Sequence, residues 1–142
     1  MEKETIVDNQ RFKTEKKLKK MFGHIDYRNP PELCTIRDVL SLSSDKWSTL
    51  IILYLGYFPV LRFNKLKKYV YGISNKVLSE RLKALETYGY LHRKVYAEVP
   101  IRVEYSLTEF GQKYVEKLLE LTEWMQKNNP MILANKDKFQ IK

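Results

Sequence analysis

Residues 72–89 read GISNKVLSERLKALETYG and predict one amphipathic helix with a glycine at either end. Ser74 is a favourable N-cap, because its side-chain oxygen can accept a hydrogen bond from a free backbone N–H of the first turn. Gly89 suits the left-handed residue that closes a helix. The apolar positions recur at helical spacing and predict a buried face; they are Val77, Leu78, Leu82 and Leu85.

The segments on either side of this helix predict a winged helix-turn-helix. Upstream, a short helix is predicted over residues 62–69, and Gly72 supplies the turn that follows it. Downstream, residues 90–97 and 101–107 are rich in β-branched and aromatic side chains and predict a hairpin. A helix, a turn, a second helix and a hairpin in this order indicate an α+β fold of the kind that grips duplex DNA.

A strongly apolar helix is predicted before this unit, and a capped helix after it. The first has one apolar face, which consists of Trp47, Leu50, Ile51, Tyr54, Leu55 and Phe58. Ile52 and Leu53 add apolar surface beyond that face, so we expect this helix to be central or to lie at a subunit contact. Thr108 is expected to cap the last helix, and Asn128-Asn129-Pro130 is expected to end it.

The length of 142 residues favours one domain. Residues 1–28 are charged and weakly patterned, so we expect a basic arm or an extra helix there. The winged helix-turn-helix domain is expected over residues 29–128, and residues 129–142 are expected to be a C-terminal tail. We see no signal peptide or apolar span, and one cysteine excludes an intramolecular disulfide framework, so we expect a cytoplasmic protein without a membrane partner.

The charge of the chain favours an anionic partner. The formal net charge is +9. Residues 62–102 hold ten Lys or Arg side chains against three Glu side chains, which leaves +7 of that charge in this one window. A solvated surface is the ordinary fate of charged residues. The concentration of charge on a helix-turn-helix and its hairpin favours nucleic acid instead.

The candidate DNA contacts fall on the helix and the hairpin. Asn75 can bond adenine, Lys76 can reach guanine acceptors, and Ser79 suits either base. The polar face of the predicted reading helix comprises Ser74, Asn75, Lys76, Ser79 and Lys83. Candidate phosphate contacts from the first helix and the wing are Arg62, Lys65, Arg93, Lys94 and Arg102. The alternative is a solvent-exposed helix and an ordinary two-stranded cover over the core.

Cys34 is the chemically distinctive side chain. It lies near a predicted helix N-terminus with Arg37 one turn on, and both features favour the thiolate. Glu32 and Asp38 oppose that effect, and a lone cysteine is more often a small buried hydrophobe. With two His and one Cys the chain lacks the ligands of an ordinary structural zinc site, and we expect no metal, no cofactor and no enzyme activity.

A set of ordered motifs spans about residues 33–127. The set consists of Cys34, Asp45-Lys46-Trp47, Arg62-Phe63, Gly72-Ile73-Ser74, Val99-Pro100, Glu104-Tyr105-Ser106-Leu107-Thr108, Gly111 and Trp124. Together these motifs resemble the HxlR-type winged helix-turn-helix regulators. The resemblance implies a winged helix-turn-helix with added N- and C-terminal dimerisation helices, in a dimeric bacterial or archaeal transcription factor.

The resemblance also implies roles for particular residues. The first and last helices would form the dimer, and the candidate interface residues are Leu33, Trp47, Leu121 and Trp124. Some members of the family sense oxidants or electrophiles through a cysteine near the start of the domain, and Cys34 occupies the matching place. The stretch 56–61 departs from the family, because it is apolar where a polar turn is typical.

We therefore expect a homodimeric, sequence-specific regulator of operator DNA, a repressor, with an oxidant or small molecule of unknown identity as inducer. The alternative is a winged helix module that binds proteins and not DNA, which the clustered Arg and Lys residues disfavour. A thiol-based redox enzyme is the third hypothesis, and the lack of a resolving cysteine or partner histidine disfavours it.

Overall fold

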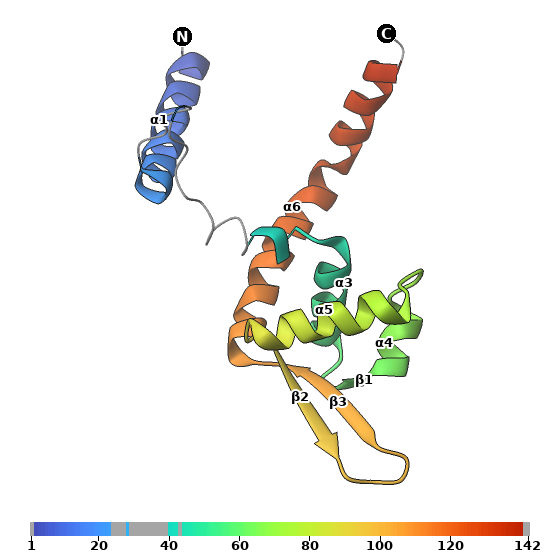
Figure 1. Ribbon diagram of the computed structural model, residues 1–142. Coiled ribbons are helices and arrows are strands. Elements are labelled where there is room, and N and C mark those ends of the chain that lie inside the picture. Colours follow the sequence, from blue (N-terminus) through green and yellow to red (C-terminus); the bar gives the residue numbers. More distant parts are fainter. Residues whose placement is uncertain (1, 24–27, 29–39, 43, 141–142) are drawn as a thin grey trace. The chain divides into compact units, whose positions relative to one another are not determined.

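The computed structural model describes residues 2–23, 28, 40–42 and 44–140, in two units that divide after Ser41. The first unit contains α1 (Glu2–Phe22), shown in Figure 1. The side chains described on α1, from residue 6 on, are mostly exposed. This helix lies within residues 1–28, where the sequence predicted a basic arm or an extra helix. The predicted residues Leu33 and Cys34 lie outside the described residues.

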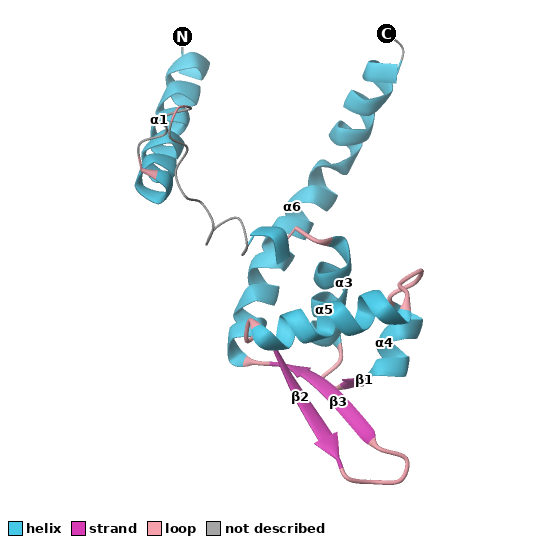
Figure 2. Ribbon diagram, viewed as in Figure 1, coloured by secondary structure: helices cyan, strands magenta, loops and turns pink. Residues whose placement is uncertain are grey.

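The second unit has its helices and its hairpin in the predicted order, with one further short strand, β1. Its helices are α3 (Lys46–Tyr57), α4 (Phe63–Tyr69), α5 (Asn75–Thr87) and α6 (Glu109–Gln140). Its strands are β1 (Leu61–Arg62), β2 (Leu91–Tyr96) and β3 (Arg102–Leu107). Figure 2 shows the β2–β3 hairpin projecting from the helices as a wing. The α+β winged helix-turn-helix class predicted from the sequence is confirmed.

The strands form one antiparallel sheet in the order β1-β3-β2. The hairpin register pairs Leu91 with Leu107 and Tyr96 with Arg102. The sequence did not predict β1, because a two-residue strand is too short to show an alternating pattern. Arg62 was predicted to begin the first helix, and it instead ends β1, opposite Glu104, and is the N-cap residue of α4.

One apolar core joins α3, α4, α5, the sheet and α6. Its most buried side chains are Ile51, Ile52, Leu66, Val70, Ile73, Leu78, Leu82 and Leu85. Three of these eight side chains, Leu78, Leu82 and Leu85, belong to α5, so the predicted buried face of this helix is confirmed. Burying an aliphatic side chain of this size contributes about 1.5–3 kcal/mol, so this face holds α5 firmly against the core.

The buried face of α3 differs from the predicted one. The buried residues are Ser48, Ile51, Ile52 and Leu55, whereas Leu50 is 37% exposed. The stripe is rotated toward Ile52 because α3 packs against α5, β3 and α6 together. Tyr54 and Phe58 point instead toward Tyr69 at the end of α4.

The predicted end of the last helix at Asn128-Asn129-Pro130 is wrong. α6 continues through Pro130 to Gln140, so the predicted tail over residues 129–142 is helical as far as residue 140. Pro130 has no N–H to bond the carbonyl of Gln126. Both residues are exposed, so water can bond that carbonyl and the helix can continue.

Candidate nucleic-acid interface

α5 begins and ends where its sequence directs. The Ser74 hydroxyl accepts a hydrogen bond from the backbone N–H of Val77 at 3.1 Å. Gly72 and Gly89 have φ of +86° and +83°, a region that side chains with a Cβ rarely adopt. The predicted cap and the two glycine turns are therefore confirmed, and they fix both ends of the helix.

The predicted reading residues share the solvent face of α5. Ser74, Asn75, Lys76, Ser79 and Lys83 are all exposed, in the N-terminal and central turns. The Ser74 hydroxyl already accepts the capping hydrogen bond, which leaves it its O–H donor and one acceptor position for a partner. Asn75 and Lys76 occupy the first turn, the part of a recognition helix that faces base edges.

An ion pair ties α5 to the start of α3. Arg81 Nε donates to Asp45 Oδ2 at 2.9 Å, and the same oxygen accepts from the backbone N–H of Ser48 at 2.9 Å. Burial acts to raise the pKa of Asp45, but the Ser48 hydrogen bonds and the Arg81 charge outweigh it and lower the pKa. Asp45 therefore stays ionised and caps α3 while holding the reading helix. The sequence showed Asp45 only as a motif residue, without its partner.

The turn between α4 and α5 is fixed from within. The ammonium group of Lys67 donates to the backbone carbonyl of Ile73, and Ile73 is itself buried. Lys65 and Arg62 remain exposed on this side of the helix-turn-helix. Of the basic residues here, Lys67 is thus committed to the fold, and Lys65 and Arg62 stay available to a partner.

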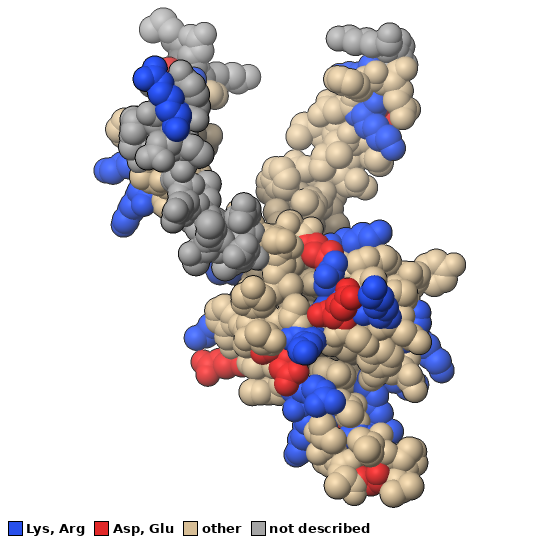
Figure 3. All heavy atoms as spheres, viewed as in Figure 1, with Lys and Arg blue, Asp and Glu red and all other residues tan. Residues whose placement is uncertain are grey.

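A groove brings the reading helix and the wing together. It has a volume of about 360 Å³ and is lined by Phe63, Ser79, Lys83, Glu86, Arg93 and Tyr105. Two predicted residues of α5 and one of the wing therefore line the same groove. Figure 3 shows Lys and Arg side chains gathered where the hairpin meets the helices. The positive charges of Lys83 and Arg93 suit this groove to a run of phosphate groups, and Glu86 is the acidic residue among those that line it.

The wing residues have two different environments. Arg93 and Lys94 are exposed on β2. Arg102 was predicted to contact phosphate, but its guanidinium lies 3.8 Å from the Tyr96 ring centroid and 3.1 Å from a Glu98 carboxylate oxygen. These contacts, with Glu104 at 3.7 Å, hold Arg102 within the hairpin, and its contact with phosphate stays a prediction.

A close contact that sequence reasoning missed fixes the base of the wing. The Thr108 hydroxyl donates to the Gly89 carbonyl at 2.5 Å and accepts from the N–H of Gly111 at 2.9 Å. A Cβ on Gly111 would lie 2.2 Å from the Tyr90 carbonyl oxygen. Burial, with a smaller contribution from Tyr114, raises the pKa of Tyr90. The sequence signal for this contact was the spacing Thr108-x-x-Gly111, which places a glycine one turn after the residue that caps the helix.

The predicted dimer residues differ in their surroundings. Trp47 is half-buried, packs against the core and approaches the turn at Gly72, with Lys46 over its ring at 4.4 Å. Leu121 and Trp124 on α6 are 50% and 59% exposed. Large apolar side chains in such positions suit a contact with another chain.

The described residues contain no helix that is long and apolar enough to cross a membrane. They also contain no cluster of three or more His, Cys, Asp or Glu side chains that could hold a metal ion. Because Cys34 lies outside them, the structure says nothing about its environment.

Comparison with known proteins gives one family. Residues 42–132 match the model of the HxlR-like helix-turn-helix family. The uncharacterized HTH-type transcriptional regulator YtfH of Escherichia coli strain K12 is 40% identical over 106 residues, which cover 75% of this chain and 83% of YtfH.

Solved structures agree in fold over the same region. The ytfH protein of Salmonella typhimurium has a TM-score of 0.65 at 38% identity, with 71% of this chain and 89% of that chain covered. The redox regulator HypR in its reduced form has a TM-score of 0.63 at 32% identity, with 70% and 98% covered. The match to the family model and these likenesses show that the chain belongs to the HxlR-like family of helix-turn-helix transcriptional regulators.

Proposed function

We propose that this regulator binds operator DNA as a homodimer and represses transcription by competing with polymerase. The observation that carries the proposal is the basic groove in which Ser79 and Lys83 of α5 lie together with Arg93 of β2. A helix in the major groove and a hairpin on the adjoining backbone need basic side chains from both elements on one surface. Binding to chromosomal DNA would place the protein in the cytoplasm.

The side chains divide into two groups by the contacts they can make. Asn75 and Lys76, exposed at the start of α5, would read base edges, because bidentate pairing with adenine or guanine distinguishes base pairs in the major groove. Lys83, Arg93 and Lys94 would contact phosphates and fix the register without reading sequence. Lys65 and Arg62 would add phosphate contacts from the first helix of the motif.

A second copy of the chain would pack on α6. The helix exposes Leu121, Trp124 and Met125 in its middle turns, beyond the buried residues Val115 and Leu118. Apolar side chains of this size are costly to leave in water and are enriched at homodimer interfaces. A two-fold axis there would present two α5 helices to successive turns of the major groove, about 34 Å apart.

Cys34 is proposed as an oxidant or electrophile sensor. Its support is the helix start and Arg37 in the sequence, together with the likeness to a protein named as a redox regulator. Treatment with hypochlorite should weaken operator binding, and Cys34→Ser should remove that response while keeping the affinity of the reduced protein. Equal responses from the two proteins would exclude Cys34 as the sensor.

A competition assay tests DNA binding itself. The protein is titrated with a labelled duplex from its own promoter region in the presence of excess random duplex. Asn75→Ala should weaken the specific complex by about 1–3 kcal/mol and relax one position per half-site, while affinity for random duplex stays the same. Equal binding of specific and random duplex by the wild type would contradict sequence-specific recognition, and binding of neither would favour a protein-interaction module.

A further inference from the structure

We propose that a cavity between α3 and α4 binds a small, planar, uncharged aromatic molecule. The cavity has a volume of about 400 Å³ and is lined by Leu50, Leu53, Tyr54, Tyr57, Phe58 and Tyr69. That volume lies within the range of small-molecule sites, which begins near 300 Å³. The DNA surface described above uses none of these six residues.

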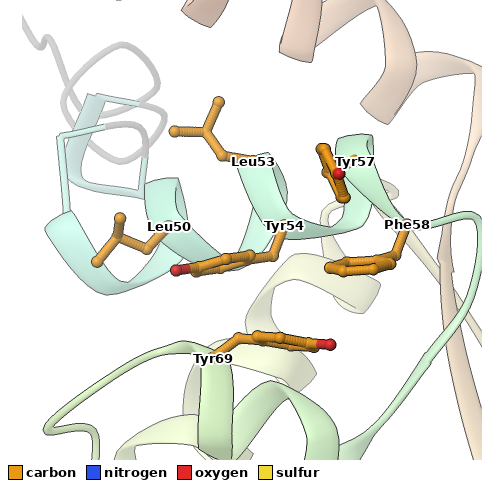
Figure 4. A pocket seen from close by; sticks show the side chains of 6 residues that line it. All are labelled: Leu50, Leu53, Tyr54, Tyr57, Phe58 and Tyr69. Atoms are coloured by element: carbon orange, nitrogen blue, oxygen red, sulfur yellow. The ribbon is translucent and has the colours of Figure 1, made fainter.

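The shape of the cavity favours a flat ligand. The rings of Tyr54 and Tyr69 are 5.4 Å apart with 22° between their planes, and those of Phe58 and Tyr69 are 4.9 Å apart with 20°. Figure 4 shows these three rings lying nearly parallel, with Leu50, Leu53 and Tyr57 along the α3 side. A planar aromatic molecule can extend such a stack in the offset geometry that aromatic rings prefer.

The chemistry of the lining favours a neutral molecule. None of the six side chains carries a charge, so an ionic ligand would lose hydration without gaining a counter-ion. A neutral aromatic molecule therefore matches these apolar walls.

Two exposed or half-exposed rings form one side of the cavity. Tyr57 and Phe58 belong to the apolar stretch 56–61. Tyr57 is 79% exposed and meets Phe58 edge-on, with centroids 4.7 Å apart. A core residue would be covered, so these two rings have apolar surface left for a ligand to bury.

Binding at this cavity would reach the reading helix by a short path. Tyr69 is the last residue of α4, the buried Val70 follows it, and four residues separate Tyr69 from the α5 cap at Ser74. A ligand that displaces the Tyr69 ring would move the turn that positions α5. This consequence for DNA rests on the proposed function, whereas the binding site itself does not.

Calorimetric titration of the full chain with 1-naphthol tests the site. We expect saturable binding of 1-naphthol and at least tenfold weaker binding of decahydro-1-naphthol, which has the same carbon skeleton without flat rings. Tyr69→Ala should weaken naphthol binding at least tenfold. The matched control is Tyr71→Ala, because Tyr71 is 94% exposed and does not line the cavity.

Leu50→Trp is the second variant, because the larger side chain should fill the cavity and block naphthol binding. Leu50 is partly exposed, so this variant should have the same Tm as the wild type. Equal binding of the two probes, or unchanged binding in both Leu50→Trp and Tyr69→Ala, overturns the site. Operator affinity is then measured with and without 1-naphthol. Unchanged affinity overturns the link to α5 but leaves the site intact, and a wild type that binds naphthol but no operator contradicts the proposed function alone.

Discussion

Replacing Gly111 by alanine should detach the base of the wing from α6. The added Cβ would lie 2.2 Å from the Tyr90 carbonyl oxygen and 3.2 Å from Leu107 Cδ2. A carbon and a carbonyl oxygen approach to about 3.3 Å at closest, so the two elements must separate by roughly 1 Å. The Tyr90 carbonyl cannot withdraw freely, because it accepts the backbone N–H of Thr108 at 3.0 Å.

The magnitude follows from three opposing effects. Overpacking costs about 1–3 kcal/mol, and a weakened backbone hydrogen bond adds about 1 kcal/mol. Alanine is about 1 kcal/mol more favourable than glycine inside a helix, which offsets part of this loss of stability. We therefore expect Gly111→Ala to lower the free energy of unfolding by about 2 kcal/mol and Tm by roughly 6–10 °C.

Thermal and urea unfolding followed by circular dichroism measure this change. Gln112→Ala is the matched control, because Gln112 is exposed on the same turn of α6 and should change Tm by less than about 2 °C. A Gly111→Ala protein that melts at or above the wild-type temperature would refute the close contact. It would also contradict the conclusion that this contact fixes the base of the wing.

Three further predictions concern charge and assembly. Because its pKa is lowered, Asp45 contributes fully to stability above the ordinary carboxyl range near pH 4. That contribution is lost as the pH falls below this range. Asp45→Asn should therefore flatten the acid limb of a plot of stability against pH. Arg93→Ala should reduce the slope of log affinity against log salt by about one unit at unchanged Tm, whereas Arg102→Ala should lower Tm because it braces the hairpin. A lower Tm for Arg93→Ala with an unchanged slope would contradict this division. Trp124→Ala should shift the chain toward monomer at micromolar concentration in analytical ultracentrifugation, and an unchanged dimer, or a monomeric wild type, would count against α6 as the interface.

The parts of the fold that the sequence predicted correctly are those with local causes. α5 follows from a cap at Ser74, a left-handed glycine at Gly89 and apolar spacing between them. The hairpin follows from two β-rich runs around a short link. In each case the deciding residues lie within one helix or two adjacent strands, where sequence spacing and spatial neighbourhood agree.

The errors come from contacts between elements distant in the chain. The sequence did not show that Arg102 pairs with Glu98 and lies near Glu104 within the hairpin. The buried face of α3 differs from the predicted one because four elements, α4, α5, β3 and α6, pack against that helix. The aromatic cavity required Tyr69 of α4 to lie beside Phe58, which no periodicity in either segment indicates.

Hydroxyl-radical footprinting on the promoter region of its own gene tests the central claim most directly. Two α5 helices on a two-fold axis should protect two half-sites of a pseudo-palindrome whose centres are about 34 Å, or one turn of DNA, apart. Because Asn75→Ala weakens the specific complex, this variant should need roughly 5–150 times more protein to give the same pattern. Uniform protection without paired half-sites, or no protection at concentrations where the dimer forms, would contradict the account.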